Sequence, residues 1–282
     1  MIDRLSEIAH AKLNLALHVR SRDADGYHAI ETLFVFTAAG DGLTAHADDG
    51  LHLTVTGPFA DALAGEDDNL ILRAARAIQA RFGISRGAAM ALEKNLPVAS
   101  GIGGGSADAA AAIRLLACLW DIPAGEPGLM EVARSLGADV PACLLSSPCL
   151  GTGRGDALQP LDDLGLAGLP VLLVNPRVPV PTGPVFARWD GTDRGPLAVG
   201  SSVIDSALAG RNDLELPARQ IAPVIDDVLA ALREGQGVRL ARMSGSGATC
   251  FALYETPAAR DDAFARIAAQ QPGWWSLATT LR

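Results

Sequence analysis

Apolar and polar residues alternate strictly near the start of the chain. Apolar side chains fall at every second position from Ala9 to Val19, and most positions between them are polar. A period of two places successive side chains on opposite faces of a β-strand. We therefore expect a half-buried strand over residues 9–20, whose polar face carries Lys12 and Asn14 together.

A period of three to four residues appears next. Between 69 and 82 the apolar residues form one helical stripe, with Asn69 as a suitable N-cap and Gly83 as a suitable C-terminal stop. An alanine-rich helix is predicted over about 106–120, followed by a short helix that ends at 136. Further strands are predicted at 32–36, 51–56, 88–93, 171–175, 238–242, 249–254 and 275–281, and further helices at 216–234 and 257–270.

This succession of elements predicts the fold class. Strands and helices are interspersed in both halves of the chain, whereas the stretch from about Gly151 is rich in Gly, Pro and Asp. Such a pattern is typical of an α+β protein with two domains. We place these domains at 1–155 and 156–282.

Composition narrows the classes of partner. The 282 residues are 49% hydrophobic and 20% charged, as in soluble globular proteins, and the net charge is −9. An acidic surface disfavours nucleic acid and anionic membranes, so a phosphorylated ligand needs a local positive site. The four cysteines form no CxxC pair, and no signal peptide or membrane-spanning run is evident. We expect a cytoplasmic protein, either a monomer or a weak homodimer.

The stretch Ser100-Gly101-Ile102-Gly103-Gly104-Gly105-Ser106 lies between a predicted strand and a predicted helix. Glycines allow a backbone to approach a phosphate closely, and the N-terminus of a helix attracts anions. No Gly-Lys-Ser/Thr follows, so this is not a Walker A loop, and Ser106 replaces the last glycine of a dinucleotide fingerprint. Ser106 suits either the cap of the following helix or a phosphate contact. Taken alone, the stretch is also compatible with a plain flexible turn.

Seven stretches together resemble one family. They are AKLNLALHV, DGYHAIETLF, LEKNLPVASGIGGGSADAA, LGADVPACL, PTGPVF, RNDLE and MSGSGATCF, and they cover nearly the whole chain in the order of the GHMP kinases. The resemblance implies a ribosomal protein S5 domain 2-like N-terminal domain and a ferredoxin-like C-terminal domain. It also implies ATP-dependent phosphorylation of a cytidine diphosphate-linked polyol, in non-mevalonate isoprenoid precursor biosynthesis.

The resemblance carries roles for particular residues. Asp139 matches the catalytic base and Lys12 the catalytic lysine that keeps this carboxylate ionised. The ATP-binding residues it implies are Lys94, Pro97, Val98, Ala99, Ser100, Gly101, Ile102, Gly103, Gly104, Gly105, Ser106 and Ala107. The substrate-binding residues are Asn14, Tyr27, His28, Thr182, Phe186 and Asn212. Mg²⁺ is expected with the ATP phosphates, since it retains waters and needs few protein ligands.

The chain departs from the family after the glycines. Ala107 stands where relatives commonly have a second serine, and Asp108 where they often have asparagine. We place Asp108 in the first turn of the predicted helix, where an inward carboxylate would repel phosphate. We expect it to face away from the phosphates or to help hold Mg²⁺.

Simpler interpretations exist for single residues. Asp139 alone suits the cap of a helix beginning at Pro141, and Gly245-Ser246-Gly247 suits a hairpin turn. Competing functions are another kinase of the superfamily, acting on homoserine, mevalonate or a sugar, and a non-catalytic nucleotide-binding module. An NAD-dependent oxidoreductase is poorly supported, because it requires a parallel sheet. Tyr27 and His28 favour a substrate with a base, since their rings suit stacking and hydrogen bonding.

Overall fold

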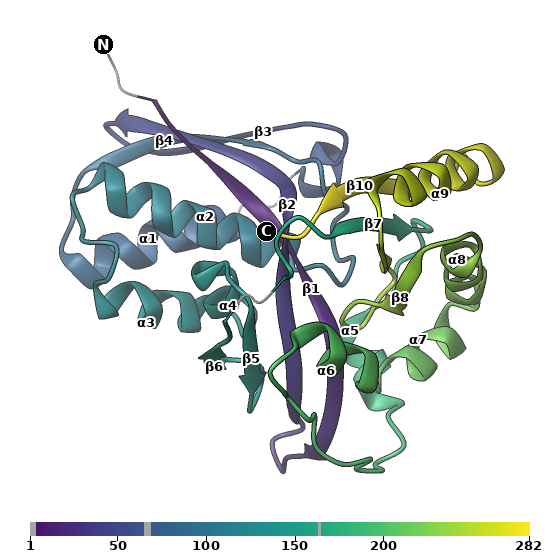
Figure 1. Ribbon diagram of the computed structural model, residues 1–282. Coiled ribbons are helices and arrows are strands. Elements are labelled where there is room, and N and C mark those ends of the chain that lie inside the picture. Colours follow the sequence, from purple (N-terminus) through teal and green to yellow (C-terminus); the bar gives the residue numbers. More distant parts are fainter. Residues whose placement is uncertain (1–3, 65–68, 163–164) are drawn as a thin grey trace. The chain divides into compact units, whose positions relative to one another are not determined.

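The computed structural model describes residues 4–64, 69–162 and 165–282 and divides into two compact units (Figure 1). The first unit comprises the chain up to Ala11 together with Ala39–Val98 and Gly103–Ser146, and the second comprises Lys12–Ala38, Ala99–Ile102 and Ser147–Arg282. Two long strands, β1 (Leu5–Arg22) and β2 (His28–Asp48), contribute to both units. Both units therefore draw on segments distant in sequence, and a single boundary at 155/156 stays a prediction.

In the first unit, helices pack beside a strand layer (Figure 1). The end of β2 pairs antiparallel with β4 (Gly87–Glu93), and β3 (Leu51–Thr56) pairs parallel with β4. The helices are η1 (Ala60–Leu63), α1 (Leu70–Phe82), α2 (Gly104–Leu119), α3 (Pro127–Leu136) and α4 (Val140–Leu145).

Helices α1 and α2 show how the sequence determines local structure. Asn69 caps α1 by accepting a hydrogen bond from Ile71 N at 2.9 Å, and Gly83 ends it in the left-handed conformation, as predicted. In α2 the run Ala109–Ala112 is fully buried. Small side chains allow α1 and α4 to pack closely against α2, and this packing positions the glycine-rich stretch at its N-terminus.

The second unit contains an antiparallel sheet in the order β10–β7–β9–β8. Its strands are β7 (Pro170–Asn175), β8 (Val238–Met243), β9 (Cys250–Tyr254) and β10 (Trp275–Thr280), and its helices are α5 (Thr182–Ala187), α6 (Val203–Ala209), α7 (Glu215–Ile221), α8 (Val224–Arg233) and α9 (Pro257–Gln270). This strand order, with helices between β7 and β8 and between β9 and β10, is that of the ferredoxin-like fold. The expected architecture of this half is confirmed.

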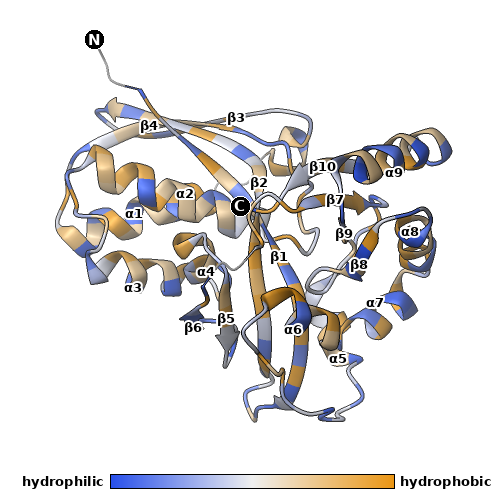
Figure 2. Cartoon of the chain, viewed as in Figure 1, coloured by the Kyte–Doolittle hydropathy of each residue, from blue (hydrophilic) through white to orange (hydrophobic). Residues whose placement is uncertain are grey.

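Burial explains the stability of this sheet. All six residues of β7 are buried, and the strand is hydrophobic along most of its length (Figure 2). Ile225, Val228 and Leu229 of α8 and Ile267 of α9 belong to the same apolar cluster as Leu172 and Val174. Burial of each large aliphatic side chain contributes about 1.5–3 kcal/mol.

Some predicted elements were wrong. Residues 216–234 form two helices, α7 and α8, because the chain breaks at Pro223, which lacks an N–H for a continuous helix. The strands β5 (Cys149–Thr152) and β6 (Ala157–Pro160) and the helix α6 were not predicted. Both strands are only four residues long and give almost no periodic signal. Among the described residues, no helix is long and apolar enough to cross a membrane.

Candidate active site

Lys12 and Asn14 lie side by side on β1, as the alternation predicted, but their face of the strand is buried rather than polar and open. Lys12 Nζ donates to Asn14 Oδ1 at 2.9 Å and lies 5.1 Å from the ring centre of Phe34. Asn14 Nδ2 donates to Thr32 Oγ1 at 2.8 Å. Thr32 itself donates to the carbonyl oxygen of Ala16. These partners satisfy the buried polar groups and fix the direction of the Lys12 side chain.

The hairpin between β8 and β9 holds the part of the glycine-rich stretch that belongs to the second unit. Ser244 Oγ donates to Gly101 O at 3.0 Å and accepts from Asn14 N at 3.1 Å, while Thr249 N donates to Ser100 O at 3.1 Å. A Cβ on Gly101 would lie 2.5 Å from Ser244 O, so only glycine fits there. The prediction of a hairpin turn at 245–247 is confirmed.

Thr182 and Asn212 meet the same hairpin. Thr182 Oγ1 lies 3.0 Å from Ser246 Oγ. Asn212 Nδ2 donates to Met243 O and Gly245 O, both at 2.8 Å. Because both amide hydrogens of Asn212 serve the hairpin, its side chain anchors this segment, and a substrate contact by Asn212 stays a prediction.

Aromatic rings gather around His28 in the second unit. Its ring centre lies 5.0 Å from that of Phe186 in a tilted arrangement and 5.7 Å from that of Trp189, edge to face. Burial, reinforced by the charge of Arg22, lowers the pKa of His28 and favours the neutral imidazole. A neutral imidazole offers one donor and one acceptor, as recognition of a base edge requires. Tyr27 precedes this cluster and remains largely exposed.

A buried charge cluster lies beneath the start of α2, within the first unit. Lys94 Nζ donates to Asp41 Oδ2 at 2.5 Å and to Asp108 Oδ2 at 2.6 Å. Asp41 Oδ1 also accepts from the backbone N–H groups of Asn95 and Leu96. A Cβ on Gly104 would lie 3.1 Å from Lys94 Nζ, so the ammonium packs directly against the first residue of α2.

The cluster holds two carboxylates and one ammonium. Burial raises the pKa of Asp108 to about 7 despite the opposing charge of Lys94. Burial alone would lower the pKa of Lys94, but the charges of Asp108 and Asp41 outweigh it and raise it. Asp108 Oδ1 is buried and has no hydrogen-bond partner among the described residues. The Asp108 carboxylate pairs with Lys94, and the expectation that it faces away from the phosphates or helps to hold Mg²⁺ stays a prediction.

The start of α2 also differs from the prediction. The helix begins at Gly104, two residues earlier than expected, so Gly103 occupies the N-cap position and Ser106 lies within the first turn. Ser106 is therefore not the cap, and Asp108 lies beyond the first turn. Among the described residues no side chain caps this helix, and its first N–H groups suit the oxygens of a phosphate.

Asp139 occupies the N-cap position of α4, which packs on α2 in the first unit. Helix α4 starts at Val140, and the Asp139 side chain makes no capping hydrogen bond to it. The expected position of Asp139 at the start of a helix is confirmed, without a side-chain capping bond, and its role as a base stays a prediction. Lys12 belongs to the second unit, so its pairing with Asp139 stays a prediction.

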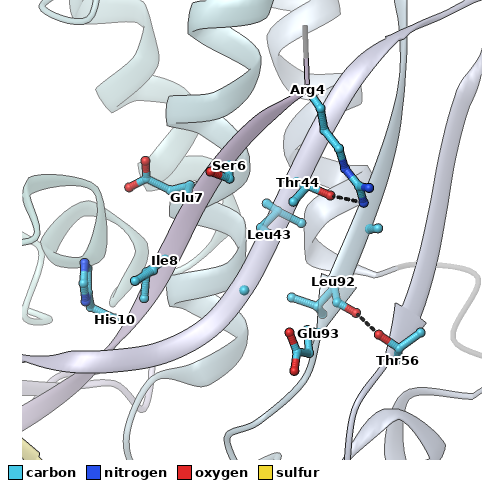
Figure 3. A pocket seen from close by; sticks show the side chains of 12 residues that line it. Arg4, Ser6, Glu7, Ile8, His10, Leu43, Thr44, Thr56, Leu92 and Glu93 are labelled. Carbon is cyan, nitrogen blue, oxygen red and sulfur yellow. Dashed lines mark hydrogen bonds between the residues drawn. The ribbon is translucent and has the colours of Figure 1, made fainter. Parts of the chain in front are cut away.

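An open depression of about 640 Å³ lies on the strands of the first unit (Figure 3). Its lining side chains include those of Arg4, Glu7 and Glu93, and no predicted site residue is among them. Arg4 donates to Thr44 Oγ1 at 2.8 Å, and Glu7 pairs with Arg114. The Arg4 and Glu7 side chains are thus paired within the protein, and we assign the depression no catalytic role.

Sequence reasoning missed several residues of these clusters. Asp41, Thr32 and Ser244 act through contacts with residues distant along the chain, and no local pattern distinguishes them. Arg154 has a weak signal, because it stands between two glycines in the stretch rich in Gly, Pro and Asp that begins at about Gly151.

A resident metal ion would need several ligand side chains close together. Within residues 4–64, 69–162 and 165–282, no group of three or more His, Cys, Asp or Glu side chains is suitably placed to hold a metal ion. Mg²⁺ commonly binds through substrate phosphates and keeps several waters. The residues present fit a cation that arrives with a nucleotide rather than a resident metal.

Family models match both halves of the chain. The model described as GHMP kinases N terminal domain matches residues 69–147, and the model described as GHMP kinases C terminal matches residues 204–273. The first matched region contains the glycine-rich stretch and Asp139, and the second contains the β8–β9 hairpin.

Curated relatives and solved structures point to the same family as these models. The 4-diphosphocytidyl-2-C-methyl-D-erythritol kinase of Rhizorhabdus wittichii is 56% identical over 279 residues, covering 98% of this chain and 94% of the relative. The enzyme of the same name from Sphingopyxis alaskensis is 50% identical and covers 99% of each. A crystal structure of 4-(cytidine 5'-diphospho)-2C-methyl-D-erythritol kinase superposes with a TM-score of 0.81 at 35% identity, covering 98% of this chain and 99% of that one. A homoserine kinase from Cytophaga hutchinsonii, at 19% identity and a TM-score of 0.73, shares the fold.

Proposed function

The chain belongs to the GHMP kinase family, and we propose that it transfers the γ-phosphoryl group of ATP to the 2-hydroxyl group of 4-diphosphocytidyl-2-C-methyl-D-erythritol. The observation that carries this proposal is the similarity to kinases of that substrate along nearly the whole chain. The reaction belongs to the non-mevalonate route to isoprenoid precursors. A cytoplasmic location and a monomeric or weakly dimeric state are part of the same proposal.

Asp139 is the proposed base. A hydroxyl is a poor nucleophile, and a carboxylate within about 2.6–3.2 Å of its proton accepts that proton as the phosphorus–oxygen bond forms. The similarity to kinases of this substrate supports this role, and the part of the chain matched by the N-terminal family model includes Asp139. In the same step the bond between the γ-phosphorus and the β-phosphate oxygen breaks, and ADP leaves with that oxygen.

Lys12 is the proposed electrostatic partner. Its ammonium is buried and directed by Asn14, which Thr32 holds in turn. An ammonium near a carboxylate favours the ionised acid and stabilises negative charge that develops on transfer. Phosphoryl transfer requires mainly positioning and charge stabilisation. One carboxylate and one ammonium are therefore enough to activate the acceptor hydroxyl.

The residues from Pro97 to Ala107 are proposed to bind the ATP phosphates through backbone N–H groups and the Ser106 hydroxyl. The uncapped start of α2 supports this role. When bound, Mg²⁺ neutralises the phosphates. Lys94 is proposed to support the ATP-binding residues indirectly. Its ammonium pairs with Asp41 and Asp108 and packs against Gly104 at the start of α2.

The rings of Tyr27, His28 and Phe186 are proposed to recognise the cytosine. The neutral imidazole of His28 provides hydrogen-bonding groups, and Tyr27 and Phe186 provide aromatic faces for stacking. Asn14 and Thr182 are proposed to contact the polyol part, Thr182 beside the hairpin that it contacts through Ser246.

The proposal is tested by incubating the chain with Mg-ATP and 4-diphosphocytidyl-2-C-methyl-D-erythritol and following phosphorus NMR. A new phosphomonoester resonance that grows in step with ADP is expected. ADP formation without a phosphorylated acceptor would indicate hydrolysis of ATP and would contradict the proposal.

A further inference from the structure

Arg154 is held at the tip of the turn between β5 and β6. Gly155 N donates to Thr152 O at 3.0 Å and closes the turn, and Gly153 and Gly155 adopt positive φ angles of 67° and 94°. Ile30 N donates to Gly153 O at 2.7 Å, which ties the turn to the start of β2. The backbone that carries Arg154 is therefore fixed beside the residues that follow Tyr27.

The Arg154 guanidinium lies over the Tyr27 ring. Its guanidinium carbon lies 3.9 Å from the centre of the Tyr27 ring, well within the distance of a cation–π contact. The guanidinium also forms an ion pair with Asp25, in the turn that precedes Tyr27. The side chains of Arg154 and Asp25 are 44% and 52% exposed, so both contacts are open to solvent.

A phosphorylated substrate requires a cation that this acidic chain must supply locally. The net charge is −9, so long-range attraction does not favour an anion. Guanidinium binds phosphate oxygens through two parallel hydrogen bonds and stacks on aromatic rings at the same time. Arg154 already makes the stacking contact with a proposed base-binding residue.

The ion pair with Asp25 does not prevent such binding. Exposed pairs of this kind contribute only about 0–1 kcal/mol, because water screens both charges. A diphosphate carries more charge than one carboxylate and can replace Asp25 while the guanidinium stays on the Tyr27 ring.

We propose that Arg154 binds the diphosphate of the cytidine substrate and thereby makes the chain selective for a diphosphate-linked cytidine. This inference rests on the proposed function, since it places the cytosine at Tyr27 and His28. It assigns Arg154 as a specificity residue, with no part in the transfer step.

Three variants separate this role from a structural one. Arg154→Met removes the cation, and Asp25→Asn removes its ion-pair partner but keeps the cation. Arg219→Met is a matched control, because Arg219 is 39% exposed and pairs with Asp226 in the same unit. KM values for the cytidine substrate and for ATP are measured for each variant, at low and at high salt.

We expect Arg154→Met to raise KM for the cytidine substrate about tenfold, the lower end for a hydrogen bond to a charged group, without changing KM for ATP. Asp25→Asn and Arg219→Met should leave both values within about twofold. Salt should raise KM for the cytidine substrate more in the wild type than in Arg154→Met, since screening weakens only an interaction that is present. Equal increases in Arg154→Met and Asp25→Asn would show that the ion pair merely supports the turn, and would overturn the proposal.

Calorimetric titration with the cytidine substrate distinguishes a failure of the proposed kinase reaction from a failure of the proposed role of Arg154. Weaker binding by Arg154→Met, without turnover by the wild type, would contradict the kinase reaction but support the role of Arg154. Unchanged affinity in Arg154→Met would overturn that role even if the wild type is an active kinase. If Arg154→Met does not fold, Arg154→Lys replaces it, since lysine keeps the charge but loses the paired hydrogen bonds. An unchanged KM for the cytidine substrate in Arg154→Lys, together with a salt-independent KM of the wild type, would also overturn the proposed role of Arg154.

Discussion

Replacement of Asp108 with asparagine tests the charge balance of the cluster beneath α2. In the native chain one ammonium faces two buried carboxylates, and Asp108 Oδ1 has no hydrogen-bond partner among the described residues. Asparagine keeps a carbonyl oxygen that accepts from Lys94 but removes the second negative charge. The variant should therefore leave a neutral pair of Lys94 and Asp41.

The magnitude follows from the pKa of Asp108, which burial raises from 3.8 to about 7. Below its ordinary pKa this carboxyl is protonated in both the folded and the unfolded chain. Between that value and about 7 the unfolded chain releases the proton while the folded chain keeps it, so rising pH favours unfolding. Each pH unit in this window lowers the free energy of unfolding by about 1.4 kcal/mol, and above about pH 7 the effect of this group is constant.

Urea titrations at about pH 5.5 and about pH 8 measure this effect. The free energy of unfolding of Asp108→Asn relative to the wild type should rise by about 2 kcal/mol between these two pH values. Asp61→Asn, the same change at an exposed position of the first unit, controls for the loss of a carboxylate as such. Identical pH dependence of the wild type and Asp108→Asn would refute the reasoning.

The other residue roles make sharper kinetic predictions. Asp139→Asn should lower turnover by roughly 10²–10⁴ with ATP affinity nearly unchanged; turnover within a few-fold of the wild type would remove Asp139 from the mechanism. Tyr27→Ala should raise KM for the cytidine substrate more than KM for ATP, and equal increases would indicate general damage instead. Gly101→Ala places a Cβ 2.5 Å from Ser244 O, so thermal melts should show a loss of about 1–3 kcal/mol and KM for ATP should rise. An unchanged KM for ATP would separate this contact from nucleotide binding.

Local signals in the sequence predicted the helices well where caps and periodicity coincide. Helix α1 has both its cap residues where they were expected, and α9 spans the predicted 257–270, with Thr256 as the cap. The failure at 216–234 came from continuing a periodic pattern through Pro223. Pro223 ends the helical hydrogen bonding, although the apolar periodicity continues from α7 into α8.

The burial of the β1 polar face had no local signal. Lys12 and Asn14 alternate with apolar residues as they would on a half-exposed strand. Their burial depends on Ser244, 230 positions from Asn14, and on Thr32 in β2. Tertiary contacts at such separation decide whether an alternating strand has one buried face or two.

The motifs identified the loop and the family but not the supporting charges. The glycine-rich stretch is recognisable by its residue types, whereas Asp139 was assigned only through the resemblance to the family. The partners of Lys94 lie 53 and 14 positions away, and Asp25 lies 129 positions from Arg154. Only the folded chain brings these charges together.

Measurement of ADP release from Mg-ATP with three acceptors in parallel tests the proposed kinase reaction. We expect ADP formation with 4-diphosphocytidyl-2-C-methyl-D-erythritol and none above background with homoserine or mevalonate. Activity with homoserine or mevalonate alone would contradict the base-recognition role of Tyr27 and His28 while keeping the kinase. No ADP with any of the three would contradict the kinase reaction itself.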